Sequence, residues 1–80
     1  MRARVFVTPK RGVLDPQGKA IEASLHSLGY EEARDVHLGK YIELSLEGID
    51  RNSADQRVEE MCRKLLANGV IEDYRFEIEG

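Results

Sequence analysis

A pattern of period two near both ends of the chain limits the possible folds more than any other feature. In the segment Ala3–Thr8, the small apolar residues Ala3, Val5 and Val7 alternate with Arg4, Phe6 and Thr8, and Pro9, which cannot donate to a sheet ladder, ends the pattern. The segment Tyr74–Glu79 alternates in the same way. Strict alternation predicts strands with one buried and one exposed face. The buried sets are Ala3, Val5 and Val7 in the first segment, and Tyr74, Phe76 and Ile78 in the second.

Two segments between these strands have helical periodicity. The first begins at Asp15-Pro16, because aspartate caps helix starts and proline fits the first helical position. Its apolar residues recur on one helical face, at Ile21, Leu25 and Leu28. Gly29 favours a stop, so we predict a helix over Pro16–Leu28.

The second helical segment begins near Ser53, which with Gln56 has the spacing of a capping box. An apolar stripe follows, formed by Ala54, Val58, Met61, Cys62 and Leu65. Asn68-Gly69 favours a helix end. The pattern therefore predicts a second amphipathic helix with all five stripe residues in the core.

The stretch Val36–Glu47 predicts two further strands around Gly39-Lys40. Their apolar residues share one face only if Leu38 pairs with Ile42, because a shift of one residue turns every side chain to the other face. We therefore expect either a bulge at Gly39 or an odd-length loop over Gly39-Lys40-Tyr41.

The resulting order is β-α-β-β-α-β in a single domain over residues 1–80. It predicts an α+β fold with a four-stranded, mostly antiparallel sheet and two helices on one face. The other face carries Phe6 and Tyr41 among charges of both signs, and we expect the chain to dimerise through it. If the first and last strands are neighbours, two cations face two carboxylates: Arg2 and Arg4 against Glu77 and Glu79.

The composition also favours an oligomer. A chain of 80 residues hides only about 60% of its unfolded surface, so its own core is marginal. One cysteine excludes an internal disulfide, and two separate histidines argue against a structural zinc site. A partner subunit is then the remaining way to stabilise so small a fold.

Charge and hydropathy exclude other classes. The formal net charge of −3 argues against a nucleic-acid-binding protein, which normally has a basic excess. No apolar run is long enough to span a membrane, and the chain starts without a signal-peptide pattern. We therefore expect a cytoplasmic protein.

No combination of residues marks a catalytic, cofactor-binding or metal site. Cys62 lies on an apolar stripe and is expected in the core. His26, in the last turn of the first helix, and His37, on a short strand, lack a carboxylate or serine arrangement and are expected at the surface. The segment Lys10–Gly18 combines cations, glycines and a helix start, but Asp15 would compete with an anion, so a structural turn is favoured over an anion-binding loop.

Segments along almost the whole chain resemble the PurS family: Lys10–Gly18, Leu28–Tyr30, Val36–Lys40, Met61–Asn68 and Val70–Tyr74. Gly69 is one departure, because the family usually has proline there. The resemblance implies the small subunit of phosphoribosylformylglycinamidine synthase, in purine biosynthesis, with no catalytic residue or cofactor of its own. It also implies a homodimer or tetramer that bridges a glutaminase subunit and an ATP-dependent synthetase subunit and supports ammonia transfer.

Two sets of residues follow as hypotheses. The exposed loops would contact the other subunits through Lys10, Arg11, Gln17 and Lys40, and the dimer interface would include Phe6 and Tyr41. The alternative is a ferredoxin-like regulatory module that senses a small molecule. RNA binding would need a basic surface beside exposed aromatic residues, and the net charge does not supply it.

Overall fold

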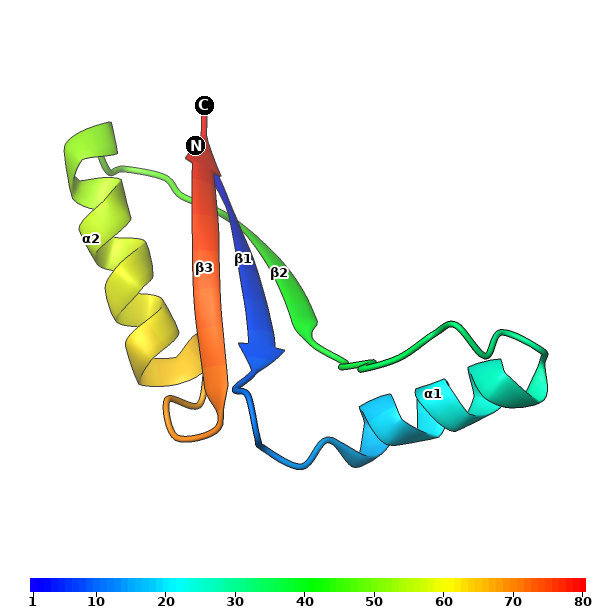
Figure 1. Cartoon of the computed structure of the whole chain (residues 1–80). Helices are drawn as coiled ribbons and strands as arrows, with labels where there is room; N and C mark the ends of the chain where they lie inside the picture. Colours follow the sequence, from blue (N-terminus) through cyan, green and yellow to red (C-terminus); the bar gives the residue numbers. More distant parts are fainter.

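The computed structural model describes residues 1–80 and contains one antiparallel sheet of three strands (Figure 1). Its strands are β1 (Arg2–Pro9), β2 (Lys40–Ser45) and β3 (Glu72–Glu79), arranged in the order β2-β1-β3. The helices are α1 (Pro16–Ser27) and α2 (Arg51–Met61), and a π-helical turn, η1 (Cys62–Leu66), continues α2. The α+β class is as predicted. Neither helix is long and apolar enough to cross a membrane.

The predicted four-stranded sheet is wrong, because Val36–Leu38 does not form a strand. The backbone N–H of Val36 donates to Glu22 at 3.2 Å, and that of Leu38 donates to Asp15 at 2.9 Å. These donors are therefore satisfied by side chains of the first helix rather than by a sheet ladder. The expected pairing of Leu38 with Ile42 does not exist; Ile42 instead lies opposite Val5 of β1.

The strands at the two ends of the chain pair as neighbours, an arrangement that the sequence pattern left open. In the antiparallel register of β1 and β3, Arg2 lies opposite Glu79 and Arg4 opposite Glu77. The ion pairs are shifted from this register, because Arg4 pairs with Glu79 and Arg2 with Glu43 of β2, the latter at 3.5 Å. On the face of the sheet that points away from the core, arginines of β1 therefore form ion pairs with carboxylates of both neighbouring strands.

The core lies between the inner face of the sheet and α2. It is centred on residues with no solvent exposure: Ala3, Val5, Val7, Ala54, Val58 and Cys62. The Tyr74 hydroxyl donates to Glu59, which ties β3 to α2 and raises the pKa of Tyr74. Burial, followed by the charge of Glu59, raises the pKa of the Cys62 thiol. Cys62 is therefore a core residue, as predicted.

Both ends of the second helix differ from the prediction. Asp50, not Ser53, is the N-cap, and its carboxylate accepts the Ser53 N–H at 2.8 Å. At the other end, the Ala67 N–H donates to the Cys62 carbonyl at 3.0 Å, five residues back. This wider turn rotates the chain, so Leu65 is 82% exposed whereas Ala67 is buried. The expectation that Leu65 belongs to the core is wrong.

The first helix forms as predicted but does not cover the sheet. The Asp15 carboxylate caps it at Gly18, and Gly29, at φ +99°, follows its end. Figure 1 shows α1 pointing away from the sheet, and no residue of α1 joins the core. The radius of gyration is 16.0 Å, against about 12 Å for a compact chain of this length. The prediction that both helices cover one face of the sheet is therefore wrong, because only α2 covers it. Residues Pro16–Leu38 form a projecting helical arm.

Candidate functional site

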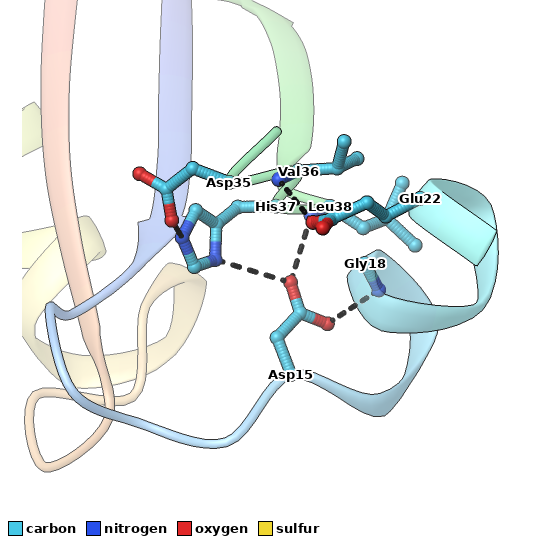
Figure 2. A network of polar contacts seen from close by, with 7 residues as sticks. All are labelled: Asp15, Gly18, Glu22, Asp35, Val36, His37 and Leu38. Atoms are coloured by element: carbon cyan, nitrogen blue, oxygen red, sulfur yellow. Dashed lines mark hydrogen bonds and ion pairs between the residues drawn. The ribbon is translucent and has the colours of Figure 1, made fainter. Parts of the chain in front are cut away.

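The base of the helical arm is held together by carboxylates (Figure 2). Asp15 accepts the Gly18 N–H at 3.0 Å with one oxygen and the Leu38 N–H at 2.9 Å with the other. Glu22, two turns further along α1, accepts the Val36 N–H at 3.2 Å. One acidic side of the helix thus holds the returning chain beside it.

These contacts require a close approach of backbone to backbone. A Cβ atom on Gly18 would lie 2.3 Å from the Val36 carbonyl oxygen and 2.6 Å from Asp15 Oδ2. Because both neighbours are fixed by the same hydrogen bonds, neither can move without loosening the base of the arm. The glycine in the first turn of α1 is therefore a packing requirement.

His37 lies between two carboxylates at this base. Its Nε2 atom is 3.0 Å from Asp35 Oδ1, and its Nδ1 atom is 3.6 Å from Asp15 Oδ2. The sequence prediction missed this cluster, although Asp35, two positions before His37, was a visible signal. His37 is exposed, as predicted, and no hydroxyl or thiol contacts its ring. The cluster can stabilise a chain segment, but it lacks the nucleophile of a catalytic arrangement.

A cleft of about 520 Å³ opens beside this network. It is lined by the loop before α1, the first turns of α1 and the returning segment. Its three carboxylates, from Asp15, Glu22 and Asp35, are already engaged, whereas the cations Arg11 and Lys19 make no ion pair. The cleft therefore carries two cationic side chains that make no ion pair within the chain.

The four predicted partner-contact residues are not brought together. Lys10 pairs with Asp73 at 2.8 Å and Lys40 with Glu72 at 3.8 Å, so both fix the connections of the arm to the start of β3. Arg11 lines the cleft, and Gln17 is exposed on the first turn of α1.

The two predicted interface aromatics do lie side by side on the open sheet face. The rings of Phe6 and Tyr41 are 5.1 Å apart between centroids and tilted by 36°. The Arg75 guanidinium lies 3.9 Å above the Phe6 ring. Burial, with a hydrogen bond to Glu43 at 3.2 Å, raises the pKa of Tyr41. This row across all three strands is an ordered, half-apolar surface.

Asp15 is expected to make the stability of the arm depend on pH. Hydrogen bonds from Gly18 and Leu38, with a smaller contribution from His37, lower the pKa of Asp15. Its carboxylate therefore stabilises the fold above the unfolded pKa of about 4, and this stabilisation is lost as the pH falls through the lower folded value. Asp15→Asn should lower the melting temperature at neutral pH, and the gap to the wild type should narrow below about pH 4.

Thermal unfolding followed by circular dichroism across this pH range measures the gap. Asp55→Asn is the matched control, because Asp55 is exposed on α2 and makes no hydrogen bond. A gap between Asp15→Asn and the wild type that stays constant down to the lowest pH would contradict the role given to the Asp15 carboxylate.

The chain combines a sheet that has one open face with a projecting arm. The base of the arm carries charged contacts but no catalytic arrangement. These features define a small α+β interaction module. The sequence profile described as "PurS: Phosphoribosylformylglycinamidine (FGAM) synthase" matches residues 2–80. The chain belongs to the PurS family, as its sequence resemblance predicted.

Individual relatives agree with this assignment. The chain is 55% identical over 78 residues to phosphoribosylformylglycinamidine synthase subunit PurS of Bacillus subtilis, covering 98% of this chain and 92% of the relative. The corresponding subunit of Methanocaldococcus jannaschii is 41% identical over 78 residues, covering 98% and 94%.

Solved structures agree as well. The B. subtilis PurS structure superposes with a TM-score of 0.88 at 54% identity, covering 99% of this chain and 98% of that one. A chain in the structure of PurLQS from Thermotoga maritima superposes with a TM-score of 0.84 at 30% identity, covering 95% and 93%. The arrangement of three strands and two helices is therefore that of the family.

Proposed function

We propose that this chain is the small, non-catalytic subunit of phosphoribosylformylglycinamidine synthase in purine biosynthesis, located in the cytoplasm. The observation that carries the proposal is the family match over residues 2–80, together with the similarity to a chain in the T. maritima PurLQS structure. The chain bridges a glutaminase subunit and an ATP-dependent synthetase subunit and supports the transfer of ammonia between them.

The base of the arm suits contact with these subunits. Arg11 and Gln17 are exposed and make no ion pair, while Lys10 and Lys40 fix both connections of the arm to β3. Arg11, a cation without an ion pair beside the cleft, can recognise a carboxylate-bearing surface. We assign Lys10, Arg11, Gln17 and Lys40 to this contact.

The chain also associates with itself, as a homodimer or tetramer. Half-apolar surfaces on so small a fold favour self-association. Phe6, half-buried, and Tyr41, 51% exposed, form the apolar centre of the open sheet face, with charged residues of both signs around them. We place Phe6 and Tyr41 in an interface between copies.

Reconstitution of the synthase from separate subunits tests the function. Omitting this chain should abolish glutamine-dependent synthesis but leave synthesis from added ammonia, because only the first reaction needs ammonia transfer. A variant with Lys10, Arg11, Gln17 and Lys40 all changed to Ala should reproduce the loss and fail to co-purify with the other subunits. The matched control removes exposed cations outside the arm, at Arg57 and Arg63.

The outcomes separate the roles. Equal loss of both reactions would contradict ammonia transfer and indicate structural support of the synthetase. Intact assembly of the quadruple variant would overturn the assigned contact residues. Unchanged glutamine-dependent synthesis without this chain would overturn the proposed function as a whole.

A further inference from the structure

We propose that Asn68 is a site of spontaneous covalent modification, at which the chain converts this asparagine into aspartate and isoaspartate. The reaction takes place in the turn between η1 and β3 and needs only this chain and water, so it is independent of the proposed function. Its consequence is a loosened attachment of the helical arm to the sheet. The two asparagines of the chain, Asn52 and Asn68, differ in the features that the reaction requires.

The reaction joins an asparagine side chain to the backbone nitrogen of the next residue. That nitrogen gives up its proton and attacks the side-chain Cγ, and the side-chain amide takes up a proton and leaves as ammonia, so that a five-membered cyclic imide remains. Water then adds to one of the two imide carbonyls. Breaking the bond from the nitrogen to Cγ yields aspartate, and breaking its bond to the main-chain carbonyl carbon yields isoaspartate. Attack therefore requires a nitrogen that is exposed and unhindered.

The turn at Asn68-Gly69 meets this requirement. Asn68, Gly69 and Val70 are exposed, and the Gly69 N–H donates no hydrogen bond within the chain. Gly69 carries no side chain, and no atom lies within 4 Å of the position that a Cβ would take. The Gly69 nitrogen is therefore open to deprotonation by solvent and free to approach Asn68.

The side chain of Asn68 is held over this nitrogen. Its Oδ1 atom accepts the Val70 N–H at 3.0 Å, which closes an Asx turn around the backbone of Gly69. The same hydrogen bond stabilises the negative charge that develops on Oδ1 when the nitrogen attacks Cγ. The turn therefore positions and polarises the group that is attacked, and it leaves the attacking nitrogen free.

Asn52 lacks these features, although it is also exposed. It lies in the first turn of α2, and the next backbone nitrogen, that of Ser53, donates to the Asp50 carboxylate at 2.8 Å. Attack at this position requires the capped helix start to open first. The fold therefore confines the reaction to Asn68.

Asn68 lies where the turn is tied to both connections of the helical arm. Its carbonyl accepts the N–H groups of Ile71 and Glu72 at 3.0 and 2.7 Å, and its own N–H donates to the Glu72 carboxylate at 2.8 Å. The Ile71 carbonyl accepts the Lys10 N–H at 2.9 Å, and Glu72 pairs with Lys40 at 3.8 Å. Isoaspartate inserts a methylene group into the backbone at this point, so these contacts cannot all be kept.

Ageing of the purified full chain in mildly alkaline buffer, followed by peptide mapping with mass spectrometry, tests the modification. The Asn68 peptide should gain the mass difference between an amide and a carboxyl group about tenfold faster than the Asn52 peptide or more, because local opening must precede attack at Ser53. Enzymatic methylation of isoaspartate identifies the second product.

Two variants of Gly69 are the matched controls. Gly69→Pro removes the attacking N–H and should abolish the conversion, and proline fits this position because Gly69 is the second residue of the turn closed by the Ile71 N–H. Gly69→Ala, whose methyl group meets no other atom, should slow the conversion by hindering the attack. Unchanged conversion in both variants would contradict the cyclic imide.

Ageing in urea supplies the unfolded reference. Conversion of Asn68 in urea but not in the folded chain would overturn the proposed site, since the turn would then protect the asparagine. Equal rates at Asn52 and Asn68 in the folded chain would overturn it as well.

The effect on the arm is measured on the isoaspartate form, separated by ion exchange. Its melting temperature should be about 4–8 °C lower, the shift expected for loss of one hydrogen bond in a chain of this size. Deuterium exchange at the Lys10 N–H should be faster, whereas exchange at the Tyr30 N–H, bonded at the tip of the arm, should not change. Asn68→Asp, which adds the charge without the methylene group, should show a smaller shift. An isoaspartate form that matches the fresh chain in both measurements would overturn the loosened attachment.

Discussion

Val58→Lys is expected to leave the chain largely unfolded at room temperature. Val58 has no solvent exposure and lies in the core beneath α2. Full burial shifts the pKa of a lysine by up to about 3–5 units, and this costs about 4–7 kcal/mol at 1.36 kcal/mol per unit. A chain of 80 residues has a free energy of unfolding of only about 4–12 kcal/mol. One charge in the core therefore removes most of its stability.

Leu65→Lys is the matched control, because the apolar stripe predicts both residues in the core and the structure buries only one. The π-helical turn leaves Leu65 82% exposed, so the same substitution should change stability by no more than about 0.5 kcal/mol. Thermal unfolding of both variants by circular dichroism makes the comparison. Comparable losses would contradict the π-helical turn and place Leu65 in the core.

The elements near the chain ends and the start of the first helix could be predicted because their signals are local. Alternation within Ala3–Thr8 and Tyr74–Glu79 determines which side chains point inward, and Asp15-Pro16 needs no distant partner to start a helix. Alternation also places Phe6 and Tyr41 on the same face of the sheet, and the pairing of β1 with β2 then brings their rings into contact.

The strand predicted at Val36–Leu38 is absent, and it shows that a local pattern cannot predict a contact with a distant side chain. Val36–Leu38 alternates like a strand, but its N–H groups are taken by Glu22 and Asp15, which precede it by 14 and 23 residues. Such side-chain acceptors compete with a sheet ladder, and no periodicity reports them. The position of α1 could not be predicted either, because an amphipathic stripe shows which face of a helix is apolar but not which surface covers it.

The site was only partly predictable. Its loop stood out by composition, but the prediction treated Asp15 only as a cap. The structure gives one carboxylate three partners: Gly18, Leu38 and His37. A sequence shows an N-cap through its neighbours three residues on, whereas a contact across 23 residues depends on the path of the whole arm.

Gly39→Ala is expected to lower the melting temperature by roughly 5–20 °C, on the basis of about 1–3 kcal/mol for overpacking and 4–8 °C per kcal/mol in a small domain. The added Cβ would lie 2.4 Å from the carbonyl oxygen of Val7. Val7 is buried on the central strand, opposite Lys40 in the register, so it cannot move aside without disturbing the β1–β2 ladder.

Gly69→Ala is the control, because no atom lies within 4 Å of the position of its Cβ. An equal melting temperature for the two variants would show that the chain passes Val7 at a greater distance. The Gly39 variant also tests how the arm joins the sheet. Gly39 is the residue at which the arm rejoins the sheet, so a methyl group there must displace either β1 or the arm. Because β1 is anchored on both sides by β2 and β3, the arm is the part that moves, and the sheet can remain folded while the arm is displaced.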